Sequence, residues 1–270
     1  MVTAVPRRAE AAPDWAFPSP PRAATEARGL DNQAKAPASV RRRTMLFMFD
    51  CDGVLVDSET IAAQVDAEHL AEVGFTITPE EVVRRFAGLT SVDIVEIIES
   101  EIGRPLAPGF LREQKAELDR RLAAEVKAVP GVHELLDRID GPICVCSNSS
   151  SERLRITMER TELWDRFRPY IFSAGEVGTK KPKPDPNVYL YALEQFRCDP
   201  RNAVVVEDSV FGVTAARAAG ARVIGFTGAS HAWPGLADLL TEAGAETVVS
   251  RLAEIPRVAE AFANWGGFDG

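Results

Sequence analysis

The 270-residue sequence has no apolar run long enough to span a membrane as a helix. It also lacks an excess of basic residues: its formal net charge is −9, which gives no support for binding to nucleic acid or to an anionic membrane surface. No secretory signal segment is visible. There are only four cysteines, and Cys144 and Cys146 alternate along one apolar run, which is not the pattern of a disulfide framework. We therefore expect a reduced, cytoplasmic protein with neither nucleic-acid nor membrane partners.

The composition that is present is that of a globular protein preceded by one unusual segment. Hydrophobic residues make up 46% of the chain and charged residues 26%, which is enough for a sizeable core. Residues 1–44 are rich in Ala, Pro and Arg, carry eight basic and four acidic residues, and have no repeated apolar face. We predict a disordered tail there. Because Met45 directly precedes the first predicted strand, a second possibility is that translation starts at Met45.

The most informative stretch is MLFMFDCDGVLVDSE, residues 45–59. Its apolar run, Met45–Phe49, has the length of a buried strand. Asp50 and Asp52 follow, and carboxylates at the end of a buried strand are costly unless a charged group lies beside them. Gly53 allows a sharp turn directly after them. Since open α/β sheets bind ligands at the carboxyl ends of their strands, we expect a functional site here.

The rest of the chain divides into a helical block and an alternating block. From about residue 59 to residue 128 the periodicity is helical, and turn residues divide this block into about four helices. From Pro130 onward, helix and strand patterns alternate, which is typical of a parallel sheet. We therefore predict an α/β fold, a doubly wound parallel sheet formed by residues 45–58 and 129–270, with an all-helical insertion at 59–128. The predicted strands are Met45–Phe49, Pro142–Ser147, Tyr170–Ser173, Ala203–Val206 and Arg222–Phe226, and the predicted helices of the sheet domain are Val132–Ile139, Ser151–Thr161, Asp185–Phe196 and Ser209–Ala219.

Polar residues occur at three later points where a strand ends or a helix begins. Ser147 and Asn148 offer a hydroxyl, an amide and backbone N–H groups to a phosphate, although plain helix capping uses the same residue types. The segment TKKPKPDPNVY, starting at Thr179, is stiffened by prolines that can aim one lysine inward. Glu207 and Asp208 end a further strand with a second pair of carboxylates. Together these elements indicate a phosphate-handling site.

These segments resemble the four motifs of the haloacid dehalogenase (HAD) superfamily, in its phosphatase and β-phosphoglucomutase branch with a helical cap domain. The match FDxDGxLxDSE is long and specific. The resemblance implies that Asp50 is the nucleophile and Asp52 the general acid and base. It also implies that Ser147 and Asn148 contact the transferring phosphoryl group. The lysine at the matching place in K-P-x-P-D is Lys181, which we predict to reach the same group.

The resemblance further implies a Mg²⁺ site. Its ligands would be Asp50, the backbone carbonyl of Asp52, and Asp208, with Glu207 acting through water or as an orienting group. Electrostatics agree, because Asp50, Asp208 and a phosphate dianion would lie close together. Each like-charge pair costs about 4 kcal/mol at about 4 Å with an effective dielectric constant of about 20. Oxygen ligands favour Mg²⁺ over Zn²⁺.

The predicted reaction is hydrolysis of a small phosphorylated metabolite, a sugar or sugar-acid phosphate, through an aspartyl-phosphate on Asp50. The stretches CDGVLVDSE, PEEVVRRFAGLT and SNSS resemble bacterial sugar-phosphate phosphatases, including the 6-phosphogluconate phosphatase group. Arg84 and Arg85 could meet an anionic end of the substrate, but we favour a solvated helix face for them.

Two alternatives stay open. A β-phosphoglucomutase-type mutase shares the motifs, yet that branch usually has a histidine where this chain has Ala62 and an arginine in the cap loop that here reads Gly88-Leu89-Thr90-Ser91-Val92. A non-catalytic protein that binds a phosphorylated ligand or Mg²⁺ could use the same fold. The sequence does not indicate the oligomeric state or the physiological substrate.

Overall fold

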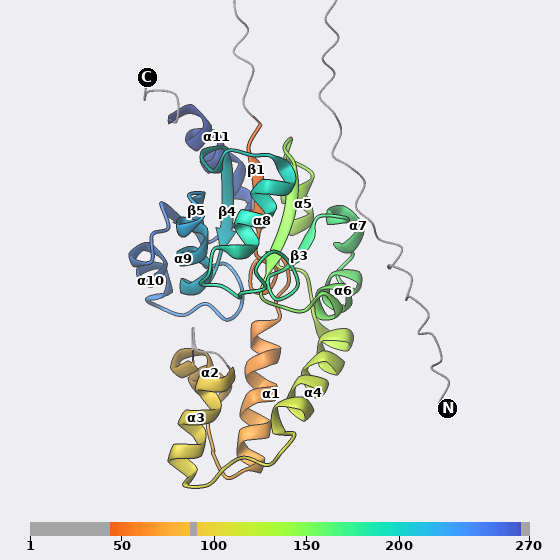
Figure 1. Cartoon of the computed structure of the whole chain (residues 1–270), viewed down its shortest axis with the longest axis vertical. Coiled ribbons are helices and arrows are strands. Elements are labelled where there is room, and N and C mark those ends of the chain that lie inside the picture. The colour runs from red at the N-terminus through yellow and green to blue at the C-terminus, as the bar shows by residue number, and fades with distance from the viewer. Residues whose placement is uncertain (1–43, 87–90, 266–270) are drawn as a thin grey trace, which may run out of the picture. The chain divides into compact units, whose positions relative to one another are not determined.

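Six strands form one parallel sheet among the residues described by the computed structural model, which are 44–86 and 91–265 (Figure 1). The strand order is β3-β2-β1-β4-β5-β6, and every neighbouring pair is parallel. The chain order reverses beside β1, and such a switch point leaves a crevice at the carboxyl ends of the strands. The strands are β1 Leu46–Phe49, β2 Ile143–Ser147, β3 Ile171–Ser173, β4 Ala203–Glu207, β5 Arg222–Phe226 and β6 Thr247–Val249.

The sheet is buried on both faces. Because successive side chains of a strand point to opposite faces, β1 contributes Phe47 and Phe49 to one apolar cluster and Leu46 and Met48 to the other. The first cluster includes residues of α5, α6 and α11, and the second includes residues of α8, α9 and α10. Burial of both faces explains the uninterrupted apolar run of β1. The helices of this layer are α5 Val132–Leu136, α6 Ser151–Arg160, α7 Trp164–Phe167, α8 Asn187–Phe196, α9 Val210–Ala218, α10 Leu236–Glu242 and α11 Ile255–Trp265.

Five described helices lie between β1 and β2, and the first four of them, α1 to α4, form the inserted cap. They bury an apolar cluster of their own, which includes Leu70, Phe86 and Ile98. The last of them, α4, packs against α1 and also against α6 of the sheet layer. The sheet and the cap helices fall within one compact unit. The cap helices are α1 Glu59–Glu72, α2 Pro79–Phe86, α3 Ser91–Ile102 and α4 Phe110–Glu125.

The predicted fold class, a doubly wound parallel sheet with a helical insertion, is confirmed. Each of the five predicted strands is present within one residue of its predicted limits. The sequence prediction does not include α7, β6, α10 or α11. Of these, α7, β6 and α10 have only three to seven residues and carry little periodicity, whereas α11, with 11 residues, lies beyond Phe226, where the prediction stops. The domain limits at 58/59 and 128/129 stay a prediction. The predicted tail, 1–44, lies outside the described residues except for Thr44.

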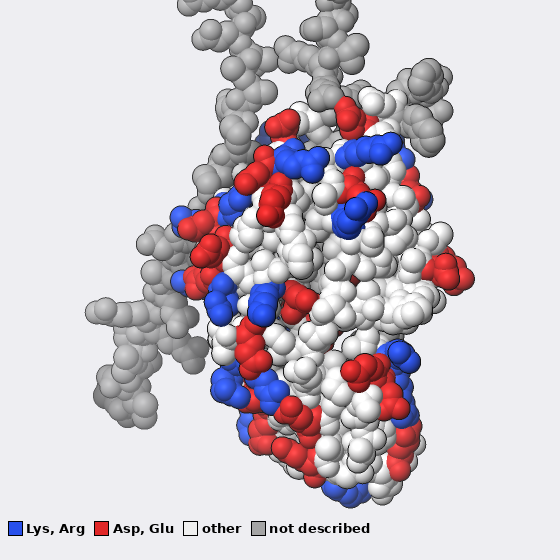
Figure 2. All heavy atoms as spheres, turned by 180° about the vertical axis from the view of Figure 1, so that it is seen from behind, with Lys and Arg blue, Asp and Glu red and all other residues white. Residues whose placement is uncertain are grey.

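Helix apolarity, surface charge and the state of the cysteines can each be compared with what the composition predicts. None of the described helices has the length and apolarity needed to cross a membrane. On the face shown in Figure 2, Lys and Arg side chains are interspersed with Asp and Glu side chains. All four cysteines are described and none forms a disulfide; Cys51, Cys144 and Cys146 are buried, and Cys198 is half-buried. Burial raises the pKa of Cys51 and of Cys144, so these groups are thiols at neutral pH.

Candidate active site

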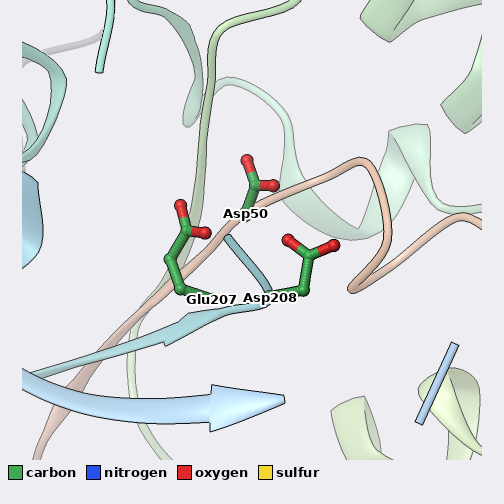
Figure 3. A group of neighbouring side chains, drawn as sticks. All are labelled: Asp50, Glu207 and Asp208. Atoms are coloured by element: carbon green, nitrogen blue, oxygen red, sulfur yellow. The ribbon is translucent and has the colours of Figure 1, made fainter. Parts of the chain in front are cut away.

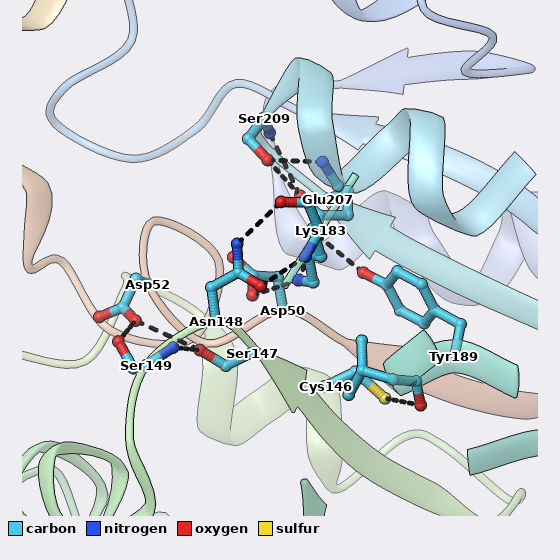
Figure 4. A network of polar contacts seen from close by, with 12 residues as sticks. Asp50, Asp52, Cys146, Ser147, Asn148, Ser149, Lys183, Tyr189, Glu207 and Ser209 are labelled. Carbon is cyan, nitrogen blue, oxygen red and sulfur yellow. Dashed lines mark hydrogen bonds and ion pairs between the residues drawn. The ribbon is translucent and has the colours of Figure 1, made fainter. Parts of the chain in front are cut away.

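The carboxyl ends of neighbouring strands bring the polar residues of the site together. Asp50 directly follows β1, Ser147 ends β2, and Glu207 ends β4 with Asp208 next to it. Because the strands are parallel, these ends meet at one edge of the sheet. Figure 3 shows the carboxyl groups of Asp50, Glu207 and Asp208 around a common space, and Figure 4 shows the polar contacts that surround it.

The three carboxyl groups form a buried acidic cluster. One oxygen atom from each of Asp50, Glu207 and Asp208 lies within 4.8 Å of the others. Burial raises the pKa of Asp50 well above its ordinary value; nearby Lys183 acts in the opposite direction, and Glu207 and Asp208 reinforce the rise. Burial likewise raises the pKa of Asp208, against the effect of His231. Such a cluster is costly unless a cation accompanies it.

Lys183 is one cation that lies among these acids. Its Nζ donates hydrogen bonds to Asp50 Oδ1 at 2.7 Å and to Glu207 Oε1 at 2.6 Å. Burial alone would lower the pKa of Lys183, but the carboxylates of Asp50 and Glu207 outweigh that effect and raise it. The ammonium group therefore stays protonated across the neutral pH range.

The prediction that Lys181 reaches the site is wrong. Its side chain is 67% exposed, and its Nζ lies 3.6 Å from Asp185 Oδ2. The backbone of Lys183, in contrast, is fixed by Asn148: the Lys183 N–H donates to Asn148 Oδ1 at 2.8 Å, and Asn148 Nδ2 donates to the Lys183 carbonyl at 3.4 Å. This pair of bonds holds Lys183 beside the end of β2. The Asn148 side chain, which the resemblance assigns to the phosphoryl group, is engaged with the Lys183 backbone instead.

Asp52 is held by serine hydroxyls from two parts of the chain. Ser58 Oγ donates to Asp52 Oδ1 at 2.7 Å, and Ser58 directly precedes α1. Ser149 Oγ donates to Asp52 Oδ2 at 2.7 Å, and Ser147 Oγ lies 3.5 Å from the same oxygen. The structure places Ser147 beside Asp52 and adds Ser58 and Ser149, which the sequence analysis did not select; a contact of Ser147 with the phosphoryl group stays a prediction.

Both oxygen atoms of Glu207 already accept hydrogen bonds. Besides Lys183, the Tyr189 hydroxyl donates to Glu207 Oε1 at 2.7 Å. The other oxygen, Oε2, accepts from Ser209 N at 3.3 Å and from Ser209 Oγ at 3.0 Å. Since a carboxylate offers about four acceptor positions, those of Glu207 are occupied. Glu207 therefore holds Lys183 in place, and any metal ion at the cluster would depend on the oxygens of Asp50 and Asp208.

His231 is a site residue that the sequence analysis missed. It lies in the loop after β5, and its Nε2 is 3.0 Å from Asp208 Oδ2. The same loop is anchored by Ser230 Oγ, which donates to Asp57 Oδ1 at 2.7 Å. The buried Nδ1 of His231 has no hydrogen-bond partner among the described residues. Nothing in the local sequence pattern separates this histidine from an ordinary loop residue.

Gly53 is required where it stands because two side chains occupy the space beside its α-carbon. Its φ is +77°, and a Cβ there would lie 1.9 Å from Asp208 Oδ2 and 2.8 Å from His231 Cε1. The turn after Asp52 can therefore approach Asp208 closely only with glycine. This close approach sets the distance between the loop that follows β1 and the acidic cluster.

A cleft of about 1120 Å³ leads from solvent to these residues and is lined by both the core and the cap. The core contributes Asp50, Asp52 and Lys183 to its floor. The cap contributes a polar wall with Glu59, Asp66, Gln114 and Lys115, and an apolar wall with Val82, Phe86 and Ile94. Burial, assisted by Asp52 and Asp208, raises the pKa of Glu59 to about 7.

Arg84 and Arg85 are not among the described residues that line this cleft. Arg85 forms an ion pair with Glu101, and its guanidinium group lies over the rings of Phe75 and Phe86 at 5.3 and 5.4 Å from their centres. These contacts agree with the interpretation of Arg84 and Arg85 as part of a helix surface.

The fold and the site geometry together describe a doubly wound α/β protein that holds a cluster of buried acids at the carboxyl ends of its strands, beside an inserted helical cap. The chain belongs to the haloacid dehalogenase-like hydrolase family, whose sequence profile matches residues 47–226. It is 33% identical over 187 residues to the 6-phosphogluconate phosphatase of Escherichia coli, an alignment that covers 69% of this chain and 84% of that protein.

Two solved structures are similar over most of the chain. A haloacid dehalogenase-like protein of unknown function from Agrobacterium tumefaciens is 50% identical, with a TM-score of 0.77, covering 82% of this chain and 99% of that one. A HAD family hydrolase from Deinococcus radiodurans, solved with bound phosphate and sodium, is 31% identical, with a TM-score of 0.70, covering 83% and 97%.

Proposed function

We propose that this protein is a Mg²⁺-dependent phosphatase that hydrolyses a sugar or sugar-acid phosphate in the cytoplasm through an aspartyl-phosphate on Asp50. The chain is a HAD-type phosphoric monoester hydrolase acting on phosphorylated small molecules. The observation that carries the proposal is the buried pairing of Asp50 with Lys183, with Asp52 held by hydroxyl groups nearby. The phosphatase activity named for the Escherichia coli relative supports the same reaction class.

The donor set fits Mg²⁺, because the acidic cluster offers carboxylate oxygens in a buried site. Asp50 and Asp208 would hold the ion directly, together with the backbone carbonyl of Asp52, and Glu207 would orient the surrounding groups. When bound, Mg²⁺ neutralises charge and polarises the phosphoryl oxygens.

In the first step, a carboxylate oxygen of Asp50 attacks phosphorus, a new P–O bond forms, and the bond from phosphorus to the sugar oxygen breaks. Lys183 holds Asp50 Oδ1, which leaves Oδ2 for the attack. The carboxyl group of Asp52 gives its proton to the departing sugar oxygen. Ser58 and Ser149 keep that carboxyl group in place during the transfer.

In the second step, Asp52 takes a proton from water, and the resulting hydroxide attacks phosphorus. Phosphate leaves, and the Asp50 carboxylate is restored. Positioning of this kind contributes roughly 7 to 11 kcal/mol to barrier lowering.

Release of inorganic phosphate from a panel of phosphorylated sugars, sugar acids, polyols and phosphoglycolate, with and without Mg²⁺, tests the proposal. The Asp50→Asn protein is the matched inactive control. Release that requires both Mg²⁺ and Asp50 is the expected result. Conversion of β-glucose 1-phosphate to glucose 6-phosphate without phosphate release would indicate a mutase instead. Absence of both reactions would favour a non-catalytic binding protein.

A further inference from the structure

Three Lys or Arg side chains are present among the described lining residues of the cleft, and their charges are neutralised to different extents. Lys183 is paired with Asp50 and Glu207. Arg153, on α6, donates from Nε to Asp119 Oδ1 at 2.6 Å. Lys115, on α4, is exposed to the cleft and has no ion-pair partner among the described residues. The cleft therefore has a cationic side chain that the phosphoryl-transfer machinery does not use.

Asp119 relates Lys115 to Arg153: it is paired with Arg153 and lies one helical turn after Lys115 on α4. Lys115 precedes Asp119 by one helical turn, which puts both residues on the same side of α4. Arg153 reaches Asp119 from α6, which packs against α4 (Figure 1). The Asp119 carboxylate pairs with Arg153, and Lys115 adds a positive charge to the same side of the cleft without an ion-pair partner among the described residues. That single positive charge matches a carboxylate, which carries a single negative charge, better than a phosphate dianion.

A chain of contacts connects this cationic pair to the reaction centre. Ser149 donates to Asp52, and the next residue, Ser150, caps α6 by accepting a hydrogen bond from the N–H of Arg153 at 3.4 Å. Asp52, Ser149, Ser150 and Arg153 all line the cleft. Arg153 is therefore about one helical turn from the serine that holds Asp52, and Lys115 lies on the cap side of it. A substrate with its phosphate at Asp50 can extend its other end toward this pair.

The wall that carries Lys115 also suits the middle of a polyhydroxylated substrate. Gln114 Nε2 donates to Asp66 Oδ1 at 2.5 Å, and both residues line the cleft with Glu59. Burial raises the pKa of Glu59 to about 7, which reduces the negative charge that this carboxyl group would set against an anionic substrate at neutral pH; burial raises the pKa of Asp66 as well. Carboxyl and amide groups of this kind bind sugar hydroxyls by hydrogen bonds.

We propose that Lys115 and Arg153 bind a carboxylate at the end of the substrate remote from its phosphate, so that the enzyme selects a phosphorylated sugar acid over the corresponding neutral compound. The proposal rests on the proposed phosphatase function and assigns its specificity to two residues. It replaces Arg84 and Arg85, whose positions do not face the cleft, as the residues that recognise an anionic end.

Gluconate 6-phosphate and glucitol 6-phosphate are a matched pair of probes, because they differ only in a carboxylate or a hydroxymethyl group at the end opposite the phosphate. We expect the wild-type protein to have the higher kcat/KM for gluconate 6-phosphate. In Lys115→Met, kcat/KM for this acid should fall roughly tenfold or more through KM, as for loss of a charge-assisted hydrogen bond, and kcat/KM for glucitol 6-phosphate should stay within about twofold. Arg153→Met should have the same selective effect.

Two control variants separate recognition of charge from damage to the fold. Lys115→Arg keeps the positive charge and should keep the preference. Lys127→Met removes an exposed lysine that does not line the cleft, and it should change kcat/KM for neither probe. Equal losses on both probes in Lys115→Met, or no loss on either, would overturn the proposal. A preference for fructose 1,6-bisphosphate over gluconate 6-phosphate would assign the pair to a second phosphate and also overturn it.

Calorimetric titration of the two probes into the Asp50→Asn protein with Mg²⁺ measures the same preference without turnover. A wild-type protein that hydrolyses neither probe would contradict the proposed function. Tighter binding of gluconate 6-phosphate that is lost in the Asp50→Asn, Lys115→Met double variant would still support the carboxylate site, and equal binding of both probes would overturn it.

Discussion

Lys183 balances the buried negative charges of the site. It contacts Asp50 and Glu207 together, and its side chain is only 4% exposed. Removing the partner of a buried charge costs about 3 to 5 kcal/mol, because the remaining charges lose their compensation. The same removal also takes a positive charge from beside Asp50, the carboxylate that we propose as the nucleophile. Lys183 therefore contributes to folding stability and to the reaction at once.

The variant Lys183→Met should lower the free energy of unfolding by about 3 to 5 kcal/mol and lower kcat by about a hundredfold or more. Lys181→Met is the matched control and should change both quantities little, since Lys181 is exposed. Urea denaturation and phosphate release measure the two effects. The reverse result, with the large loss in Lys181→Met, would restore Lys181 as the lysine of the site.

Glu59 should give the protein a specific pH dependence. Its pKa is raised from 4.5 to about 7 in the folded protein, so the folded state binds this proton more tightly than the unfolded chain does. Glu59 therefore destabilises the fold progressively as the pH rises from about 4.5 to about 7. Without metal, Glu59→Gln should gain more stability relative to the wild type at pH 8 than at pH 5, in denaturant unfolding. An equal difference at both pH values would contradict the raised pKa.

Local sequence predicted those site residues whose positions follow directly from strand ends. Asp50, Ser147, Glu207 and Asp208 each lie at or next to the end of a strand, so a correct strand prediction already brings them together. The choice between Lys181 and Lys183 depends on Asn148, which is 35 residues away in the chain. Such a contact between distant parts of the chain has no local sequence signature. The contact between His231 and Asp208 has none either.

At the scale of secondary structure, the residues that begin α9 also hold one carboxylate of the acidic cluster in place. Ser209 caps the helix by accepting from Gly212 N at 3.0 Å, and it also donates to Glu207. Gly212 then packs directly against Glu207, because a Cβ at this position would lie 1.8 Å from Glu207 Oε1. The first turn of α9 therefore sets the position of the carboxylate that orients Lys183.

Gly212→Ala should reverse the usual effect of this substitution. Within a helix, replacing Gly by Ala ordinarily stabilises by about 1 kcal/mol. Here the added methyl group must displace Glu207 and its bond to Lys183, so we expect a lower free energy of unfolding and a lower kcat. Thr214→Ala, on an exposed part of the same helix, should have little effect on kcat. A stabilised and fully active Gly212→Ala protein would show that Glu207 can move without consequence.

The strands of the sheet were accessible to sequence reasoning because their burial makes them apolar throughout. β1 is buried on both faces and reads as an uninterrupted apolar run that ends at a carboxylate. In contrast, β6 has only three residues and lies at the edge of the sheet, so its pattern is too short to distinguish from a loop.

At the scale of the whole molecule, folding brings several carboxyl groups into one place, and a bound cation would offset their repulsion. Mg²⁺ that binds only the folded state should raise the melting temperature, and the stabilisation reaches about 2.7 kcal/mol when the free ion is at about 100 times its Kd. EDTA should reverse the shift.

The variant Asp208→Asn tests whether that shift comes from the acidic cluster. It removes one of the repelling charges, so in EDTA it should be at least as stable as the wild type, and it should gain little from Mg²⁺. Asp140→Asn, at an exposed position, should respond to Mg²⁺ as the wild type does. An equal Mg²⁺-dependent shift in Asp208→Asn would place the ion elsewhere. Thermal unfolding followed by circular dichroism measures all three proteins.

The burial of the cysteines makes the natural chain suitable for labelling at a single position. Cys51, Cys144 and Cys146 are buried, and only Cys198, between α8 and the turn Pro200–Asn202, is half-buried. An accessible thiolate attacks electrophilic reagents such as maleimides, so a maleimide should react first at Cys198. Because Cys198 does not line the cleft, a fluorophore attached there could report on binding and on cap position in a fully functional enzyme, without prior removal of any native thiol.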